Sequence, residues 1–145
     1  MNTIQHKVNI MRPVTDIFRF VADFSNTPQW QPDTVDLRRA GQLRLGDMVV
    51  GTRRVMGRTM HVNADVIEYV PNQTIIYNGV MGGFFFRTTY KFTFAGSGTD
   101  VTEIMEIRIP WWNFFLRPFV TGALDSQIKT GLDNLKRVME ARNRA

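Results

Sequence analysis

Glu103 is the residue whose position most suggests chemistry. The segment Thr99–Ile109 alternates in polarity, and Glu103 falls on its apolar side, the side of Val101, Met105, Ile107 and Ile109. A carboxylate in an apolar interior is costly unless it has a partner or a raised pKa. We therefore expect Glu103 either to orient a polar group of a bound molecule or, at an irregular strand position, to reach solvent or an arginine. If the protein is an enzyme, Glu103 and Tyr90 are its candidate proton-transfer residues.

Other catalytic patterns are absent from the sequence. The two histidines, His6 and His61, lie in different segments without a second ligand at helical spacing, and there is no cysteine. No P-loop, GxGxxG, GxSxG or HExxH motif occurs. Asp65 and Glu68 are three residues apart on an expected strand, so they point to opposite faces. We expect no metal and no cofactor, and we favour a binding protein over an enzyme.

The stretch Pro110–Val120 holds five aromatic residues and a leucine beside the C-terminal segment. One face of a helix entry cannot bury all of these side chains, and exposed apolar patches usually mark a binding surface. The stretch is a candidate lid over a pocket, a dimer contact or a lip that touches a membrane. It is equally the pattern of the hydrophobic end of a core.

A long amphipathic helix is predicted over Pro118–Arg142. Gly131 falls on its apolar stripe, where glycine costs ~1 kcal/mol relative to alanine. The missing side chain leaves room either for a ligand or for a close helix–sheet contact. The stripe itself recurs at three- and four-residue steps, and its members are Leu124, Ile128, Leu132, Leu135 and Met139.

The chain before this helix reads mainly as strands. Thr3–Met11 alternates as a first strand, and Val14–Val21 and the turn that carries Trp30 read as two short helices. Six further segments have a period of two: Val35–Leu43, Met48–Met56, Arg58–Tyr69, Thr74–Met81, Phe84–Phe94 and Thr99–Ile109. Their short links require antiparallel pairing. We predict an α+β fold in one domain, residues 1–145, with a curved seven-stranded sheet wrapped around the C-terminal helix.

Composition restricts the protein class. The 145 residues are 43% hydrophobic and 21% charged, which is typical of a globular domain. No apolar run approaches the ~20 residues of a membrane span, and the N-terminus lacks a signal-peptide core, so we expect a cytoplasmic protein. The net charge of +5 is scattered without a basic run, so we expect no nucleic-acid partner.

Several motifs together resemble the START-like helix-grip (SRPBCC) superfamily, in particular its polyketide cyclase/dehydrase and lipid-transport family. They are the opening strand followed by Pro13–Asp23, then Asn26–Trp30, the Glu-x-x-Pro corner in Val66–Pro71, and the hairpin return Gly98–Thr102. The resemblance implies a deep cavity between sheet and long helix for a hydrophobic or aromatic ligand. Members of the family include lipid carriers, hormone receptors, quinone-binding proteins and aromatic cyclases, and they share no single catalytic set. Glu103 departs from the family, where an apolar residue is more usual.

Three functions follow as expectations. The first is a binder of a small hydrophobic, aromatic or lipid-like ligand in an apolar pocket of ~300–1,000 Å³. The second is a cyclase/dehydratase-type enzyme that holds a flexible substrate in a reactive fold. The third is an adaptor that touches a membrane transiently, or a protein partner, through residues 111–119, in a monomer or a homodimer. The expected pocket residues are Trp30, Phe86, Tyr90, Phe92, Glu103, Met105, Ile107, Trp111, Leu124, Ile128 and Gly131.

Overall fold

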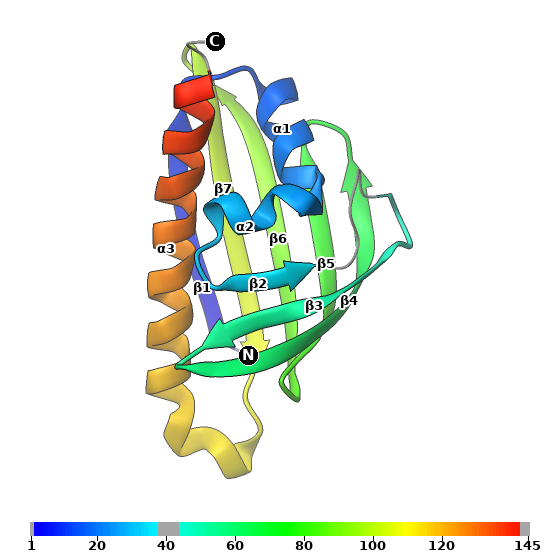
Figure 1. The fold of residues 1–145 in the computed structure, drawn as a ribbon, viewed down its shortest axis with the longest axis vertical. Coiled ribbons are helices and arrows are strands. Elements are labelled where there is room, and N and C mark those ends of the chain that lie inside the picture. Colours follow the sequence, from blue (N-terminus) through cyan, green and yellow to red (C-terminus); the bar gives the residue numbers. More distant parts are fainter. Residues whose placement is uncertain (1, 38–43, 143–145) are drawn as a thin grey trace.

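The structure is a computed structural model that describes residues 2–37 and 44–142. Within them, seven strands form one antiparallel sheet in the order β1-β7-β6-β5-β4-β3-β2 (Figure 1). The strands are β1 (Asn2–Ile10), β2 (Thr34–Leu37), β3 (Met48–Val55), β4 (Arg58–Val70), β5 (Thr74–Met81), β6 (Phe84–Ala95) and β7 (Gly98–Arg108). The helices are α1 (Val14–Ala22), η1 (Phe24–Asn26), α2 (Thr27–Trp30), η2 (Trp111–Leu116) and α3 (Arg117–Arg142). The predicted α+β architecture is confirmed.

Two tight turns set the register of the meander. Met56 and Gly57 connect β3 to β4 with φ values of 55° and 75°, and Gly82 and Gly83 connect β5 to β6 with 56° and 89°. Two consecutive residues with positive φ match the right-handed twist of the flanking strands, and glycine adopts this conformation without steric cost. With this register, the apolar residues at every second position of each strand point to the same side, so the sheet has one apolar face.

The structure describes only the first residues of the second predicted strand. The pattern predicts Val35–Leu43, whereas β2 covers Thr34–Leu37 and pairs with β3. The remainder of the predicted strand, residues 38–43, lies outside the described residues.

The long helix α3 runs beside β1 and closes the space between the two ends of the curved sheet (Figure 1). Its predicted stripe is buried, since Leu124, Ile128 and Leu135 have no exposed surface. On the other side, Gln127 Nε2 donates to the Arg54 carbonyl of β3 at 2.8 Å. The helix is therefore held by apolar packing along β1 and by hydrogen bonds to β3.

The segment α1–η1–α2 covers the part of the inner sheet face that α3 leaves open (Figure 1). Phe18 anchors α1, because its ring makes edge contacts with Tyr69 at 5.4 Å and Phe92 at 5.1 Å. Edge-to-face pairs of this kind add to the stabilisation from burial alone. Among the described residues, no helix has the length and apolar composition needed to cross a bilayer.

Candidate functional site

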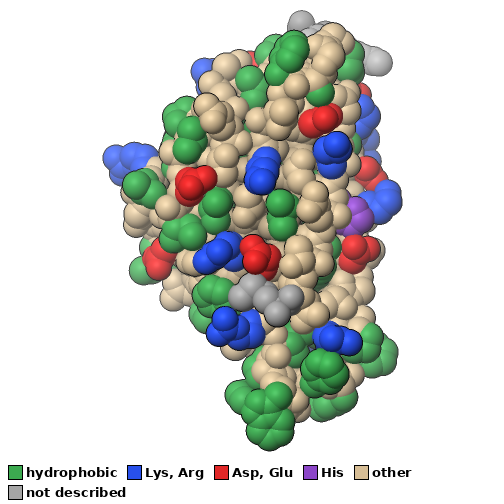
Figure 2. Space-filling view, turned by 180° about the vertical axis from the view of Figure 1, so that it is seen from behind, with side chains coloured by type: hydrophobic (Ala, Val, Ile, Leu, Met, Phe, Trp, Pro, Cys, Tyr) green, Lys and Arg blue, Asp and Glu red, His purple; other side chains and the backbone are tan. Residues whose placement is uncertain are grey.

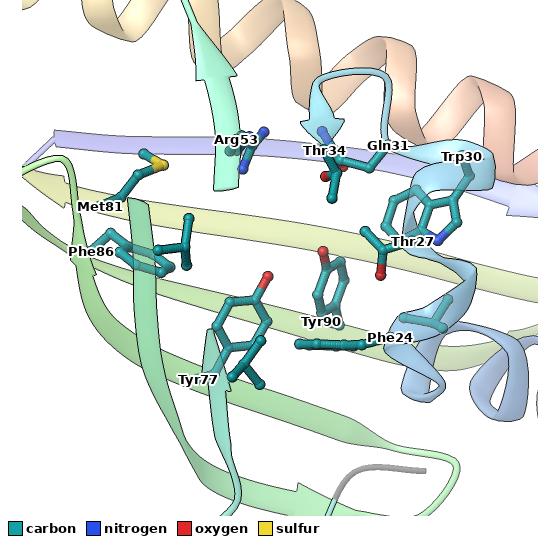
Figure 3. A pocket seen from close by; sticks show the side chains of 13 residues that line it. Phe24, Thr27, Trp30, Gln31, Thr34, Arg53, Tyr77, Met81, Phe86 and Tyr90 are labelled. Atoms are coloured by element: carbon teal, nitrogen blue, oxygen red, sulfur yellow. The ribbon is translucent and has the colours of Figure 1, made fainter. Parts of the chain in front are cut away.

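A small cavity lies between the inner face of β3–β6 and the cover formed by α1, η1, α2 and β2. Its volume is about 50 Å³, enough for a few water molecules. The side chains around it come from both layers (Figure 3). Its lining consists of Val21, Phe24, Thr27, Trp30, Gln31, Thr34, Val49, Arg53, Val62, Tyr77, Met81, Phe86 and Tyr90.

Five of the 13 lining residues carry aromatic rings. Trp30 of α2 meets Tyr90 edge-on at 6.1 Å, and Tyr77 meets Phe86 edge-on at 6.0 Å. Phe24 closes the far side against Tyr77 at 5.6 Å. The rings are held by one another and by the sheet, so the wall presents apolar edges and faces to whatever occupies the cavity.

Glu103 is buried directly beside this wall. It is 2% exposed and stands opposite Tyr90 in the β6–β7 register, with His6 opposite it on β1. Burial raises the pKa of Glu103 to about 7, against the lowering effects of the Arg53 charge and of a hydrogen bond from Tyr90. Its Oε1 atom has no hydrogen-bond partner. Near neutral pH this carboxyl can therefore hold or release a proton.

The two tyrosines place their hydroxyl groups at the cavity. In Figure 3 the hydroxyls of Tyr77 and Tyr90 point from the sheet toward Arg53 and Thr34. Burial raises the pKa of Tyr77, and burial together with the Glu103 charge raises the pKa of Tyr90 well above its ordinary value. Both hydroxyls are consequently neutral hydrogen-bonding groups at physiological pH.

Arg53 brings a positive charge to the opposite side of the cavity. Its Nε donates to Gln127 Oε1 on α3 at 3.2 Å. Its Nη2 is buried and has no acceptor. A guanidinium has five N–H donors. The hydrogen bond to Nε therefore fixes the orientation of Arg53 and leaves other donors of the same group free to bind an acceptor.

Two more buried donors belong to the same cavity lining. Gln31 Nε2 and Trp30 Nε1 have no hydrogen-bond partner, and both residues are at most 3% exposed. Buried polar groups of native proteins are nearly always paired, so each exception needs an explanation. Together with Arg53, these described residues give the cavity three unpaired donors.

The structure places the sequence-predicted pocket residues in four different positions. Trp30, Phe86 and Tyr90 line the cavity. Gly131 lies beside it against Gln31, and Trp111 lies far outside, with 82% of its surface exposed. The rest are buried in the core without lining the cavity: Phe92, Glu103, Met105, Ile107, Leu124 and Ile128.

Two expectations about the cavity need correction. It lies beneath α2 and β2 instead of between the sheet and α3, and none of its lining residues comes from α3. It is also much smaller than the expected ~300–1,000 Å³, because the rings of Trp30, Tyr77 and Tyr90 fill the space.

Phe24, Gln31, Arg53 and Tyr77 line the cavity but were not predicted from the sequence. A signal existed for Arg53, which follows Val49 and Gly51 at a spacing of two and so shares the inner face of its strand. This is the argument that singled out Glu103 on β7. Gln31 carries no such pattern, since it lies just after a helix of one turn.

The aromatic stretch lies at one end of the molecule, away from the cavity. Trp111, Trp112 and Phe115 are 82%, 61% and 71% exposed, and no residue of η2 is buried. Figure 2 shows hydrophobic side chains gathered at this end, with Lys or Arg side chains beside them. The expectation that this stretch is the hydrophobic end of the core is thus wrong for η2. Within this end, the guanidinium of Arg117 lies over the ring of Phe114 at 4.4 Å.

Within the described ranges, no three His, Cys, Asp or Glu side chains gather in a way that could hold a metal ion. The ionisable side chains at or beside the cavity are those of Arg53, Tyr77, Tyr90 and Glu103.

The chain matches a known protein family. The family described as polyketide cyclase / dehydrase and lipid transport matches residues 1–140. Among curated proteins no sequence matches the chain.

Solved structures of the same fold are numerous. TTHA0849 from Thermus thermophilus has a TM-score of 0.80 at 16% identity, with 94% of this chain and 95% of that chain covered. Protein CV1439 from Chromobacterium violaceum gives 0.73 at 18%, with 96% and 97% covered. The Aha1 dimer from Colwellia psychrerythraea gives 0.67 at 18%, with 97% of each chain covered. At these identities the likeness shows the fold alone.

Proposed function

We propose that this chain, which belongs to the polyketide cyclase/dehydrase and lipid transport family, binds a small hydrophobic or aromatic molecule in the cavity beneath α2 and β2. The observation that carries the proposal is the composition of the cavity wall. Trp30, Tyr77 and Phe86 supply apolar rings, and a few polar atoms converge among them. Ligand sites are typically mostly apolar with a small number of placed polar groups.

The cavity must enlarge when the ligand enters. At about 50 Å³ it is smaller than a substituted aromatic ring. Met81 and Gln31 form part of its boundary, and both have unbranched side chains with several rotatable bonds. Methionine in particular adapts to gaps of different shape. We expect these two side chains to move first, while the packed rings keep their places.

A pair of matched substitutions tests the proposal. Val62 lines the cavity from β4, and Val80 faces outward on β5 with 48% of its surface exposed. Val62→Phe adds a ring inside the cavity, whereas Val80→Phe adds the same ring to the outer surface. Native mass spectrometry of each protein, purified from its own host, measures any small molecule that remains bound.

Wild-type protein and Val80→Phe are expected to carry the same additional mass, and Val62→Phe is expected to lack it. Thermal unfolding shows whether Val62→Phe is folded, since overpacking costs about 1–3 kcal/mol. Protein without any bound mass contradicts the proposal. An equal mass on the folded Val62→Phe variant places the ligand elsewhere.

Proton transfer is the second candidate function, and the position of Glu103 favours it. Glu103 has a pKa of about 7 and stands behind Tyr90, which faces the cavity. The Tyr90 hydroxyl would touch the substrate and pass a proton between it and Glu103. A general base works best when its pKa lies near the working pH. Cyclase or dehydratase chemistry requires such proton removal beside a carbonyl.

Acetophenone in deuterated water tests this candidate. An enzyme of this type exchanges the methyl hydrogens of acetophenone for deuterium, which NMR follows directly. Wild-type protein is expected to accelerate the exchange, and Glu103→Gln and Tyr90→Phe are expected to abolish the acceleration. Exchange no faster than in buffer removes proton transfer from the account and leaves binding unaffected.

We also propose that η2 touches a lipid surface. The segment η2 projects from one end of the body (Figure 1), and its rings are exposed. Arg117 and Arg108 lie beside aromatic rings there. Tryptophan prefers the interfacial layer of a bilayer. Each basic side chain near an anionic bilayer adds about 1 kcal/mol of attraction. A projecting apolar end with positive neighbours suits this layer better than a flat protein contact.

Flotation with vesicles tests the contact. Wild-type protein is expected to float with phosphatidylglycerol-containing vesicles, and the double variant Trp111→Ala, Trp112→Ala is expected to remain below. Phe94→Ala is the control, because Phe94 is 78% exposed at the opposite end of β6. Wild-type protein that stays below ends the membrane proposal. A dimer that the double variant alone disrupts assigns η2 to contact between two copies instead.

A further inference from the structure

We infer that the ligand of the cavity carries an oxyanion, such as a carboxylate, which the guanidinium of Arg53 and the amide of Gln31 hold. The inference rests on the proposed function, and it names the chemical class of the ligand. It comes from the unpaired hydrogen-bond donors of the lining and from the arrangement of charges around them.

The unpaired donors call for an acceptor. Arg53 Nη2, Gln31 Nε2 and Trp30 Nε1 are buried without partners, and all three residues line the same cavity. A buried donor without an acceptor costs about 1–3 kcal/mol, and more when it is charged. A purely apolar ligand would leave this cost in place, because hydrocarbon accepts no hydrogen bond. A ligand with oxygen acceptors at this end removes it.

Arg53 favours an anion over a neutral acceptor. Its guanidinium keeps its charge at all physiological pH values, and its fork matches a carboxylate. Gln127 orients it from α3 through the 3.2 Å hydrogen bond to Nε. Figure 3 shows the hydroxyls of Tyr77 and Tyr90 on the side of the cavity that faces Arg53. The Tyr77 hydroxyl can donate to the same oxyanion, whereas the Tyr90 hydroxyl donates to Glu103 while that carboxyl is charged.

Glu103 is a nearby group that would repel an anion. The titratable and charged groups that face it are His6 on β1, Tyr90 on β6, Tyr77 on β5 and Arg53 on β3. Helix α3 contributes Asp125, whose Oδ1 lies 2.8 Å from His6 Nε2 at the surface. A protonated Glu103 removes the repulsion, and its pKa of about 7 makes this protonation easy. Oxyanion binding should therefore be accompanied by proton uptake at Glu103.

Benzoate and benzamide provide a matched pair of probes. They share ring and size, and only benzoate is an anion at neutral pH. Ligand-observed NMR measures the affinity of each for wild-type protein and for variants of two neighbouring arginines. Arg53→Gln removes the charge in the cavity, and Arg54→Gln makes the same change on the outward face of β3, where Arg54 is exposed. Arg53→Lys keeps the charge and loses the fork.

Wild-type protein and Arg54→Gln are expected to bind benzoate about tenfold or more tightly than benzamide. Arg53→Gln should bind benzoate and benzamide with about equal affinity. Arg53→Lys should retain part of the preference for benzoate. Equal binding of both probes by wild-type protein, or an unchanged preference in folded Arg53→Gln, overturns the inference and leaves the proposed binding function intact. Binding of neither probe counts against both.

The pH dependence gives a separate readout. Between about pH 6 and about pH 8, the affinity of wild-type protein for benzoate is expected to fall about tenfold, because Glu103 must take up a proton. Benzamide affinity should change far less, and Glu103→Gln should make the benzoate affinity independent of pH. A pH-independent benzoate affinity in wild-type protein contradicts the link to Glu103.

Discussion

The side-chain amide of Gln31 occupies the space that a side chain at position 131 would need. A Cβ atom built on Gly131 of α3 would lie 2.8 Å from Gln31 Oε1 and 3.3 Å from its Cδ. The glycine therefore accommodates α2, which brings Gln31 to the cavity. The sequence is compatible with a ligand or a close helix–sheet contact at this mid-helix glycine. In the structure, Gly131 instead serves the contact of α3 with Gln31, the residue that follows α2.

Gly131→Ala should weaken ligand binding while changing stability little. Alanine adds about 1 kcal/mol of helix propensity, and the displaced atom is the end of a flexible side chain. The Gln31 amide must shift, however, and it borders the cavity on its other side. We expect benzoate affinity to fall severalfold with a free energy of unfolding within about 1 kcal/mol of wild type.

Gly122→Ala is the control for this change. Gly122 lies on the same helix, and a Cβ there meets nothing within 4 Å. Its free energy of unfolding should rise by about 0.5–1 kcal/mol, and benzoate affinity should stay unchanged. Equal affinities of the two variants would show that Gly131 has no part in placing Gln31.

Glu103 should make the protein less stable as the pH rises. The pKa of Glu103 is about 7 in the folded protein, against an ordinary value of 4.5, so the folded state binds the proton more tightly. The contribution of Glu103 to the free energy of unfolding is most favourable below 4.5, its pKa in the unfolded chain. This contribution is lost as the pH rises through about 7, its pKa in the folded protein. The full loss is about 3 kcal/mol.

Urea unfolding of wild type and Glu103→Gln at several pH values measures this contribution. The free energy of unfolding of wild type should decrease between pH 4.5 and about 7 relative to that of the variant. Above this window Glu103→Gln should be the more stable protein, since it buries no charge. A constant difference between the two proteins across the window would mean that Glu103 titrates normally.

Gln127→Glu should reduce the preference for an anion. Gln127 Oε1 accepts from Arg53 Nε, and a carboxylate in its place would pair with the guanidinium that we assign to the ligand. Benzoate affinity should fall about tenfold, and benzamide affinity should change less. Gln127→Ala, which removes the positioning contact without adding charge, should have a smaller effect on the preference.

The aromatic end should contribute little to folding. Trp111 and Trp112 contact each other edge-on at 5.9 Å but are largely exposed. Replacing both by alanine should lower the free energy of unfolding by less than about 1 kcal/mol. Leu124→Ala on α3, by contrast, should cost about 2–5 kcal/mol because Leu124 has no exposed surface. A large loss in the double tryptophan variant would show that η2 packs in solution.

The fold could be predicted because its signals are local. Alternation along Phe84–Phe94 and the stripe of the C-terminal helix each report one buried face, and the glycine turns fix the antiparallel links. Glu103 was identified for the same reason, since it interrupts a regular pattern. The burial of that carboxyl agrees with the alternation that singled it out.

The cavity could be predicted only in part because it depends on distances between elements. Nothing in the sequence shows that the one-turn helix α2 brings Gln31 to Gly131, far along the chain. Nor does it show that the rings of Trp30 and Tyr77 fill most of the space that a curved sheet leaves. The predicted volume is too large for this reason, and α3 does not form the cavity wall that the sequence pattern predicts.

The most direct test of the central claim is a crystal structure of the protein with bound benzoate. We predict that the ring lies between Tyr77, Phe86 and Tyr90, with the carboxylate within hydrogen-bonding distance of Arg53. Benzoate bound at the exposed rings of η2, with the cavity closed and unchanged, would contradict it.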